Sequence, residues 1–321
     1  MWSDLPAVAE GSRVVLGGRF GEEPEQLTHQ RLDRFAADGG RLVDTAHSYA
    51  DGEAERVLGR WMRTRGRDRI AVIDKICHPH NGQLDLRPAA IRAQLDESLR
   101  RLDTDHLDVV LLHRDDPAVP VDDITAALVA EVEAGRARCL GVSNWSLPRL
   151  HRFVGLARSA GHTPIVSYQR SLAVPEHEIW PGALTITDPV TAELANARVP
   201  LLAWAGQARG WFSRTPTGDW AINAGPFASA RNRRLRDLAI EIGRGYGVPA
   251  TVVALAWLLH HEEVWPIVGP ATDVELAESL RATSLTLTEA ELSVLDLTRA
   301  AGAGTGTPTV RPSRSDGRRV Q

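Results

Sequence analysis

RLVDTAHSYADGEAERVLGRWMRTRGRDRIAVIDK (41–75) contains two short apolar runs, RLVDTA (41–46) and IAVIDK (70–75), separated by a longer segment. Neither run alternates apolar with polar residues, which is typical of strands that are buried on both faces of a parallel sheet. Parallel neighbours need a crossover of about a dozen residues or more, usually a helix, and the intervening segment is long enough for one. The stretch therefore predicts a strand–helix–strand unit.

Apolar runs of the same kind bring the number of expected strands to eight: RVVLGG (13–18), LDVVLLH (107–113), RCLGVS (138–143), PIVSYQ (164–169), PLLAWA (200–205) and VWPIVG (264–269). Segments with helical spacing lie between them, among them 27–38, 88–102, 250–260 and 275–282, and a helix that Ser146 caps. This alternation predicts an α/β fold of the (β/α)8 TIM-barrel type, a parallel eight-stranded barrel with outer helices. A Rossmann sheet is the weaker interpretation because no G-x-G-x-x-G motif follows the first strand.

The chain length suits one large barrel. Single (β/α)8 domains have about 250 residues, and longer ones carry insertions. We therefore expect one domain over residues 1–299 of the 321. Segment 300–321 is rich in Gly, Ser, Thr, Pro and Arg without periodicity, so we expect a disordered basic tail. From Arg299 onward five arginines accompany Asp316 alone, which leaves a charge of about −8 on the rest of the chain.

Overall composition argues for a cytoplasmic protein that acts on a small molecule. The formal net charge of −4 offers no basic field of the kind that nucleic acid or an anionic membrane would attract. The two cysteines, Cys77 and Cys139, lie far apart, which argues against a disulfide framework and suits a reducing compartment. No signal-peptide pattern opens the chain, and no stretch approaches about 18 uninterrupted apolar residues. A monomer or a small homo-oligomer is expected.

Polar residues stand where the chemistry of such a barrel is found, at the carboxyl ends of strands and in the loops that follow. The second strand is expected to end at Asp44 with Tyr49 in its loop, the third at Lys75 and the fourth at His113. Taken singly, a strand-end Asp or Lys is more often part of a structural ion pair, and a histidine can be satisfied by backbone groups. Because the strand ends converge on one mouth, the four together are candidate catalytic residues.

The segment VDTAHSYADGEAERVLGRWM (43–62) resembles the signature of the aldo-keto reductase superfamily around its catalytic Asp and Tyr, and the resemblance extends over residues 13–296. It implies an NAD(P)H-dependent enzyme in which Tyr49 is the general acid or base for a carbonyl or alcohol substrate. Tyrosine has a reference pKa of about 10, and a nearby Lys75 ammonium is expected to lower that pKa. Asp44 would hold the lysine, and His113 would orient the carbonyl oxygen.

The same resemblance implies where a nicotinamide cofactor lies. Ser143 and Asn144 at the fifth strand and Gln169 at the sixth match residues that bind the carboxamide, and Trp204 at the seventh matches an aromatic that stacks on the ring. Arg209 is a candidate contact to the phosphate end. The expected cofactor is NADP, which the resemblance implies. NAD is the alternative, because GPATDVELAES (269–279) carries carboxylates where relatives place basic residues that contact the 2′-phosphate of NADP.

Two other features, a short Cys/His run and a high tryptophan content, are candidates for a functional role. The run Cys77-His78-Pro79-His80 resembles metal-ligand material, but no second Cys/His pair stands near it, so no metal is expected. The chain has nine tryptophans, and Trp145, Trp180 and Trp211 lie in loops predicted on the active-site side. Indoles there favour stacking on a sugar or another ringed substrate, with ordinary packing as the competing interpretation.

Two further classes of function stay open, because a fold alone does not fix an activity. One is a barrel that binds the cofactor as a sensor or an accessory subunit without turnover, although such a role would not need Tyr49 and Lys75 together. The other is a lyase or isomerase, which would act without added nicotinamide. The sequence does not identify the substrate or the direction of the reaction.

Overall fold

The computed structural model describes residues 5, 11–18, 20–79, 83–213 and 225–300. Eight parallel strands close into a barrel in chain order, as predicted, and the first strand pairs with the eighth. Their bounds are β1 (Val15–Leu16), β2 (Leu42–Ala46), β3 (Ala71–Ile76), β4 (Leu107–Leu112), β5 (Ala137–Ser143), β6 (Ile165–Gln169), β7 (Leu201–Trp204) and β8 (Val264–Val268). Each lies within about a residue of an apolar run in the sequence.

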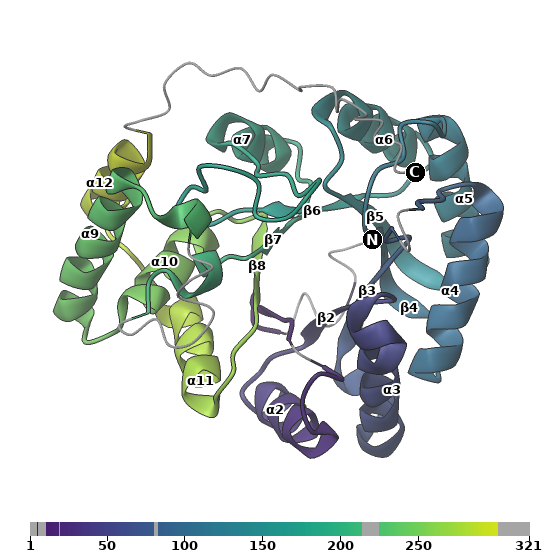
Figure 1. The fold of residues 1–321 in the computed structure, drawn as a ribbon, viewed down its shortest axis with the longest axis horizontal. Coiled ribbons are helices and arrows are strands. Elements are labelled where there is room, and N and C mark those ends of the chain that lie inside the picture. Colours follow the sequence, from purple (N-terminus) through teal and green to yellow (C-terminus); the bar gives the residue numbers. More distant parts are fainter. Residues whose placement is uncertain (1–4, 6–10, 19, 80–82, 214–224, 301–321) are drawn as a thin grey trace, which may run out of the picture.

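Helices surround the strands (Figure 1). They are α2 (Glu25–Ala37), α3 (Glu53–Arg65), α4 (Pro88–Leu102), α5 (Val121–Glu133), α6 (Leu147–Ser159), α7 (Asp188–Asn196), α9 (Ala230–Tyr246), α10 (Ala250–Leu259), α11 (Asp273–Arg281) and α12 (Glu289–Ala300). The bounds of α4 are those that the helical spacing predicted. Helix α11 begins two residues before its predicted start, because Thr272 caps it by accepting from the backbone amide of Glu275. The alternation of strands and helices gave no reason to expect α12, which follows the last strand.

The predicted tail segment 300–321 lies outside the described residues except for Ala300, which ends α12. Arg299, the last residue of the expected domain, lies in α12. Its side chain is buried and ion-paired with Asp188 at the start of α7. Cys77 and Cys139 are both buried and free.

Two apolar layers follow from the alternation of side chains along the strands. One layer fills the barrel itself and includes Leu42, Ile73, Leu111, Leu202 and Trp265. The larger layer lies between the strands and the helices, and it takes up the residues next to these in each strand. Since every strand is buried on both faces, the runs show no polar alternation in the sequence.

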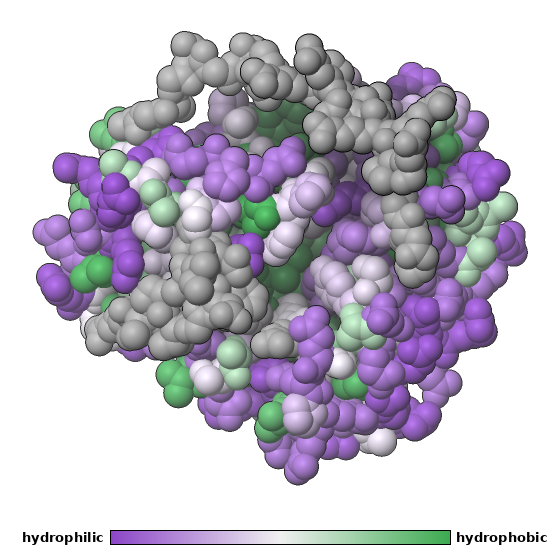
Figure 2. All heavy atoms as spheres, in the orientation of Figure 1, coloured by the Kyte–Doolittle hydropathy of each residue, from purple (hydrophilic) through white to green (hydrophobic). Residues whose placement is uncertain are grey.

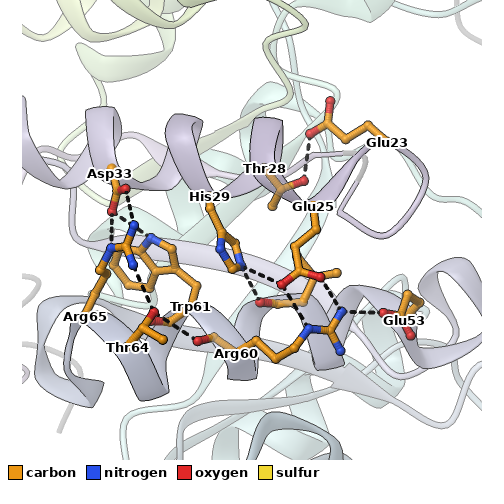
Figure 3. Close-up of polar contacts among 11 residues, drawn as sticks. Glu23, Glu25, Thr28, His29, Asp33, Glu53, Arg60, Trp61, Thr64 and Arg65 are labelled. Carbon is orange, nitrogen blue, oxygen red and sulfur yellow. Dashed lines mark hydrogen bonds and ion pairs between the residues drawn. The ribbon is translucent and has the colours of Figure 1, made fainter.

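Charged residues at the outside join α2 to α3 (Figure 3). Arg60 of α3 donates to Glu25 of α2 and to Glu53 at the start of its own helix, at 2.9 and 2.6 Å. The indole of Trp61 donates to Asp33 at 2.9 Å from a fully buried position. These contacts fix α3 in place, and α3 begins directly after the turn that carries Tyr49.

Within the described residues, no single helix is both long and apolar enough to cross a membrane. Only α9 and α10 taken together reach that length and composition, and the pair is bent by 95° at its break.

The barrel interior tolerates no added atom at Gly141 of β5. A Cβ built there lies 2.2 Å from the carbonyl oxygen of Ile165 and 2.5 Å from a methyl carbon of Leu111. We expect Gly141→Ala to lower the free energy of unfolding by about 1–3 kcal/mol, because the neighbouring strand must shift. Urea unfolding followed by circular dichroism measures the change.

Gly155 in α6 is the matched control, since a Cβ there meets nothing within 4 Å. Gly155→Ala should raise the stability by about 0.5–1 kcal/mol through helix propensity. Equal stability changes at both positions would contradict the packing described for β5.

Candidate active site

Strand alternation aims six of the predicted site residues into the mouth of the barrel. Asp44, Lys75, His113 and Trp204 each stand two residues after an interior residue of the same chain segment, and Ser143 and Gln169 stand four residues after one. Asp44 lies in the middle of β2 rather than at its end as expected, and the other five lie at or next to strand ends, so that the six side chains point inward above the apolar filling. Figure 2 shows a hollow near the centre of one face of the molecule, with hydrophobic atoms visible among hydrophilic ones.

The backbone turns sharply directly after three alternate strands. Cys77 after β3, Asn144 after β5 and Ala205 after β7 have φ values of 57°, 59° and 52°, in the left-handed region that non-glycine residues seldom adopt. Such conformations cost about 1–3 kcal/mol each and occur often at functional sites.

Lys75 and Asp44 form a buried ion pair in this mouth. The ammonium lies 2.5 and 2.6 Å from the two carboxylate oxygens, and it also donates to the carbonyl oxygen of Thr45 at 3.2 Å. Lys75 is the only lysine in the sequence, and the other 36 of the 37 lysine and arginine residues are arginines. Its single occurrence is a further signal in the sequence for this position.

Electrostatics keep the lysine charged. Burial acts against its charge, but Asp44 and Tyr49 outweigh burial and raise the pKa of Lys75 above its ordinary value of 10.5. Burial also raises the pKa of the Asp44 carboxyl, with the Lys75 ammonium opposing that rise. The lysine is therefore held as a fixed positive charge under the candidate proton donor.

Tyr49 opens a short 3-10 turn, Tyr49–Gly52, in which Ala50 and Asp51 both have positive φ. Its ring centroid lies 5.0 Å from the Lys75 ammonium. The lysine lowers the pKa of the phenol as expected, but burial is the larger effect and the net pKa is raised above 10. The expectation of a lowered pKa is thus wrong for this structure, and the phenol retains its proton at neutral pH.

His113 lies beside the same phenol, with ring centroids 5.8 Å apart in an edge-to-face arrangement. Burial, together with the positive charges of Lys75 and Arg114, lowers the pKa of His113 well below 6.5. The imidazole is therefore neutral near pH 7 and can donate one hydrogen bond. His78 packs on it at 4.6 Å between centroids.

The residues predicted to hold the cofactor form a polar row next to these side chains. The Asn144 amide donates to the Ser143 hydroxyl at 2.7 Å and accepts from the backbone amide of Leu184 at 3.0 Å. The Gln169 amide donates to Ser171 at 2.8 Å. The Gln169 carbonyl oxygen is buried and has no hydrogen-bond partner among the described residues. It is a free acceptor of the kind that a carboxamide would satisfy.

Aromatic and basic side chains gather beside this row. The ring of Trp204 lies 5.4 Å from that of Trp180, and the guanidinium of Arg209 lies 4.9 Å from the Trp180 ring. Trp180 is 45 % exposed, which makes it available to a ligand. By contrast, Trp145 is fully buried against Phe153, so the prediction that it offers a stacking face is wrong.

Trp211 also has a structural role, since its indole donates to the carbonyl oxygen of Asn232 at 3.0 Å. In the part of the chain that the structure describes, no group of three or more His, Cys, Asp or Glu side chains converges as a metal site would require. His80 lies outside the described residues.

Sequence reasoning missed the residue that supports the Tyr49 turn. Arg101 of α4 donates to the carbonyl oxygen of His47 at 3.0 Å and to buried Glu55 at 2.9 Å. It also pairs with Glu97, one turn earlier on its own helix. Arg101 looks like any helix-surface arginine in the sequence, because only the packing of α4 against the turn brings these groups together.

Comparisons with known proteins identify a family for the whole barrel. The sequence model described as the aldo/keto reductase family matches residues 14–299. A 6-dehydroglucose reductase from Agrobacterium fabrum is 29% identical over 276 residues, covering 81% of this chain and 84% of that protein. A norsolorinic acid reductase from Aspergillus flavus is 26% identical over 294 residues, covering 87% and 73%.

Solved structures share the fold. An aldo-keto reductase from Klebsiella pneumoniae in complex with NADPH superposes with a TM-score of 0.71 at 24% identity, covering 96% of this chain and 99% of that one. A structure from the same organism in complex with NADP and acetate gives a TM-score of 0.70 at 24% identity, covering 89% and 90%.

The single lysine makes the ion pair directly observable. Protein grown with carbon-13 lysine should give one ε-carbon resonance, and its alkaline titration should report a pKa above 10.5. Asp44→Asn should lower the pKa of Lys75, because burial disfavours the ammonium and the Asp44 carboxylate no longer stabilises it.

Asp122→Asn is the control, since Asp122 is exposed and pairs with Arg152 at the surface, away from the barrel mouth. A wild-type pKa at or below 10.5, or one that Asp44→Asn leaves unchanged, would contradict the ion pair.

Proposed function

The chain belongs to the aldo/keto reductase family, and on that premise we propose that it moves hydride between NADP and a carbonyl or alcohol, with Tyr49 as the general acid or base. It is an NAD(P)H-dependent oxidoreductase that acts on a small molecule. The observation that carries the proposal is the convergence of Tyr49, His113 and the buried Lys75–Asp44 pair in one mouth.

The bound nicotinamide supplies or accepts the hydride. Tyr49 gives its phenolic proton to the substrate oxygen during reduction, and the raised pKa of this phenol ensures that the proton is present at neutral pH. The resulting phenolate lies beside the Lys75 ammonium, which stabilises it, and Asp44 keeps that ammonium in position. Neutral His113 donates a hydrogen bond that orients the carbonyl oxygen.

Ser143, Asn144 and Gln169 are the proposed contacts for the nicotinamide carboxamide. The buried, unpartnered carbonyl oxygen of Gln169 supports this proposal, because a carboxamide N–H would satisfy it. Trp204 is proposed to pack on the ring, and Arg209, at the start of the next loop, to contact the phosphates.

NADP is the proposed cofactor, as bound in the two Klebsiella pneumoniae structures. One observation favours NAD instead. At the start of α11, Thr272 accepts from the amide of Glu275, and the Glu275 carboxylate accepts from the amide of Ala271 at 2.6 Å. The backbone amides of Ala271 and Glu275 therefore already donate to side chains of this segment and are not free to bind a phosphate. The Glu275 carboxylate would also repel a 2′-phosphate at this helix start.

A sugar or another ringed polar compound is the proposed substrate. Trp180 supports this, since it presents an exposed indole face next to Trp204. The sugar-derived name of the Agrobacterium fabrum relative is a second support.

Tyr49→Phe tests the role of the phenol. We expect carbonyl reduction to fall by about 10²- to 10⁴-fold in kcat, because the proton donor is lost. Cofactor affinity, measured by quenching of tryptophan fluorescence, should stay the same. Wild-type kcat for reduction should be constant through neutral pH and decline only on the alkaline side, since the pKa of Tyr49 is raised.

Tyr246→Phe is the matched control, because this tyrosine lies on α9 and donates only to Glu291 at the surface. Full activity of Tyr49→Phe would exclude Tyr49 as the acid. Cofactor binding by the wild type without turnover of any carbonyl would point to the sensor or accessory role.

Turnover with NADPH and NADH at equal concentration decides the cofactor. If the acidic start of α11 governs the choice, the preference for NADPH should be small, and Glu275→Gln should shift it towards NADPH by about three- to tenfold. Glu289→Gln, at the start of α12, is the control. A hundredfold NADPH preference in the wild type would exclude NAD as the working cofactor.

A further inference from the structure

Arg114 is held at the edge of the candidate active site. It follows His113 directly at the end of β4, and its carbonyl oxygen accepts from the indole of fully buried Trp145 at 3.3 Å. The half-buried side chain reaches across β5, since its Nε lies 4.0 Å from a Cβ built on Gly182 in the segment between β6 and α7. The charge of this guanidinium acts on Tyr49 and His113, so it lies beside the candidate site.

No carboxylate neutralises this guanidinium within the described ranges, where its nearest acceptor is the carbonyl oxygen of His113 at 3.4 Å. Three other arginines in the described ranges that are buried or half-buried have a carboxylate partner, as Arg31 has Glu23, Arg101 has Glu55 and Arg149 has Asp115. Half-buried Arg13 instead donates to three backbone carbonyl oxygens, whereas Arg114 has one such contact at 3.4 Å. A half-buried charge without such a partner is costly for the protein to keep.

Neighbouring groups do not supply the missing charge. The Lys75 and Asp44 charges cancel each other, and the Tyr49 phenol is neutral because its pKa is raised. Burial keeps the imidazoles of His113 and His78 neutral as well, by lowering the pKa of each.

The carboxylate whose charge acts on Arg114 is that of Glu178. It is exposed and lies beyond ion-pair distance, and it accepts from the backbone amide of Gly182 at 3.2 Å. Among the described residues, Arg114 therefore has no carboxylate within ion-pair distance.

We propose that Arg114 binds an anionic group of the substrate, so that the enzyme acts on carbonyl compounds that carry a carboxylate or another oxyanion. This inference rests on the proposed reduction at Tyr49 and names the substrate class for it. A guanidinium offers a planar fork of donors that matches two oxygens of a carboxylate.

Position limits the substrate further. The charge of Arg114 acts on both Tyr49 and His113, so the anionic group is expected on the same small molecule as the reacting carbonyl and close to it. A ring that carries the carboxylate would also use the exposed face of Trp180, so a sugar acid or an aromatic oxoacid satisfies both features.

Carboxybenzaldehydes and nitrobenzaldehydes form a matched set of probes. The nitro group has the shape of a carboxylate without its charge, and the 2-, 3- and 4-isomers vary the distance from carbonyl to substituent. Steady-state kcat and KM are measured for wild type, Arg114→Gln and Arg114→Lys. Arg152→Gln serves as the control, since Arg152 is an exposed arginine of α6 paired with Asp122.

We expect wild type to prefer at least one carboxybenzaldehyde over its nitro isomer. Arg114→Gln should lose about 10- to 100-fold in kcat/KM for that compound, mainly through KM, and about threefold or less for the nitro compound. Arg114→Lys should recover part of the loss because it keeps the charge but not the fork.

Equal effects of Arg114→Gln on charged and neutral aldehydes, or no effect on either, would overturn the inference. If wild type reduces nitrobenzaldehydes but shows no preference for a carboxylate, this inference fails while the proposed function stands. If no aldehyde is reduced, the proposed function fails, and calorimetric binding of benzoate to wild type and Arg114→Gln still decides the role of Arg114. Equal benzoate affinity, or no binding to wild type, would then overturn it.

Discussion

The buried ion pair between Lys75 and Asp44 is the constraint on which the rest of the site depends. Two charges removed from water are tolerated only because each neutralises the other at hydrogen-bond distance, so neither residue can be lost alone without leaving an uncompensated charge. The pair joins the middle of β2 to the end of β3, and its charges act on the neighbouring groups. It acts on the phenol of Tyr49 and helps to keep the imidazole of His113 neutral.

A second polar layer lies behind this pair, outside the barrel wall. Asp74, next to the lysine, faces outward and is fully buried near Glu55, so that burial and the second carboxylate raise its pKa well above the ordinary value. Arg101 pairs with Glu55 and donates to the carbonyl oxygen of His47, which precedes the turn that carries Tyr49. The geometry of the candidate site therefore depends on helices α3 and α4 as well as on the strands, since Arg101 of α4 and Glu55 of α3 support the turn that carries Tyr49.

Charge also separates the two halves of the mouth. On one side the positive charge of Lys75 is neutralised inside the protein, whereas on the other side Arg114 faces the mouth without a carboxylate partner among the described residues. The Lys75–Asp44 pair suits a group that must keep one protonation state through a reaction. The Arg114 guanidinium, without a carboxylate partner, suits a group that binds an anionic ligand. A reductase needs both, since it must hold a proton donor ready and also select the compound that receives the proton.

The sequence by itself determined the eight strands, the closed barrel and the places of Lys75 and His113 at strand ends, because apolar runs and the residues that follow them are local properties of the chain. Only the tertiary structure decided that burial outweighs the lysine at Tyr49, that Trp145 is part of the core while Trp180 is exposed, and that Arg299 folds back into the protein. These outcomes depend on how deeply a side chain is covered and on which distant residues cover it. Neither quantity is carried by residue type or spacing, so the packed fold had to supply both.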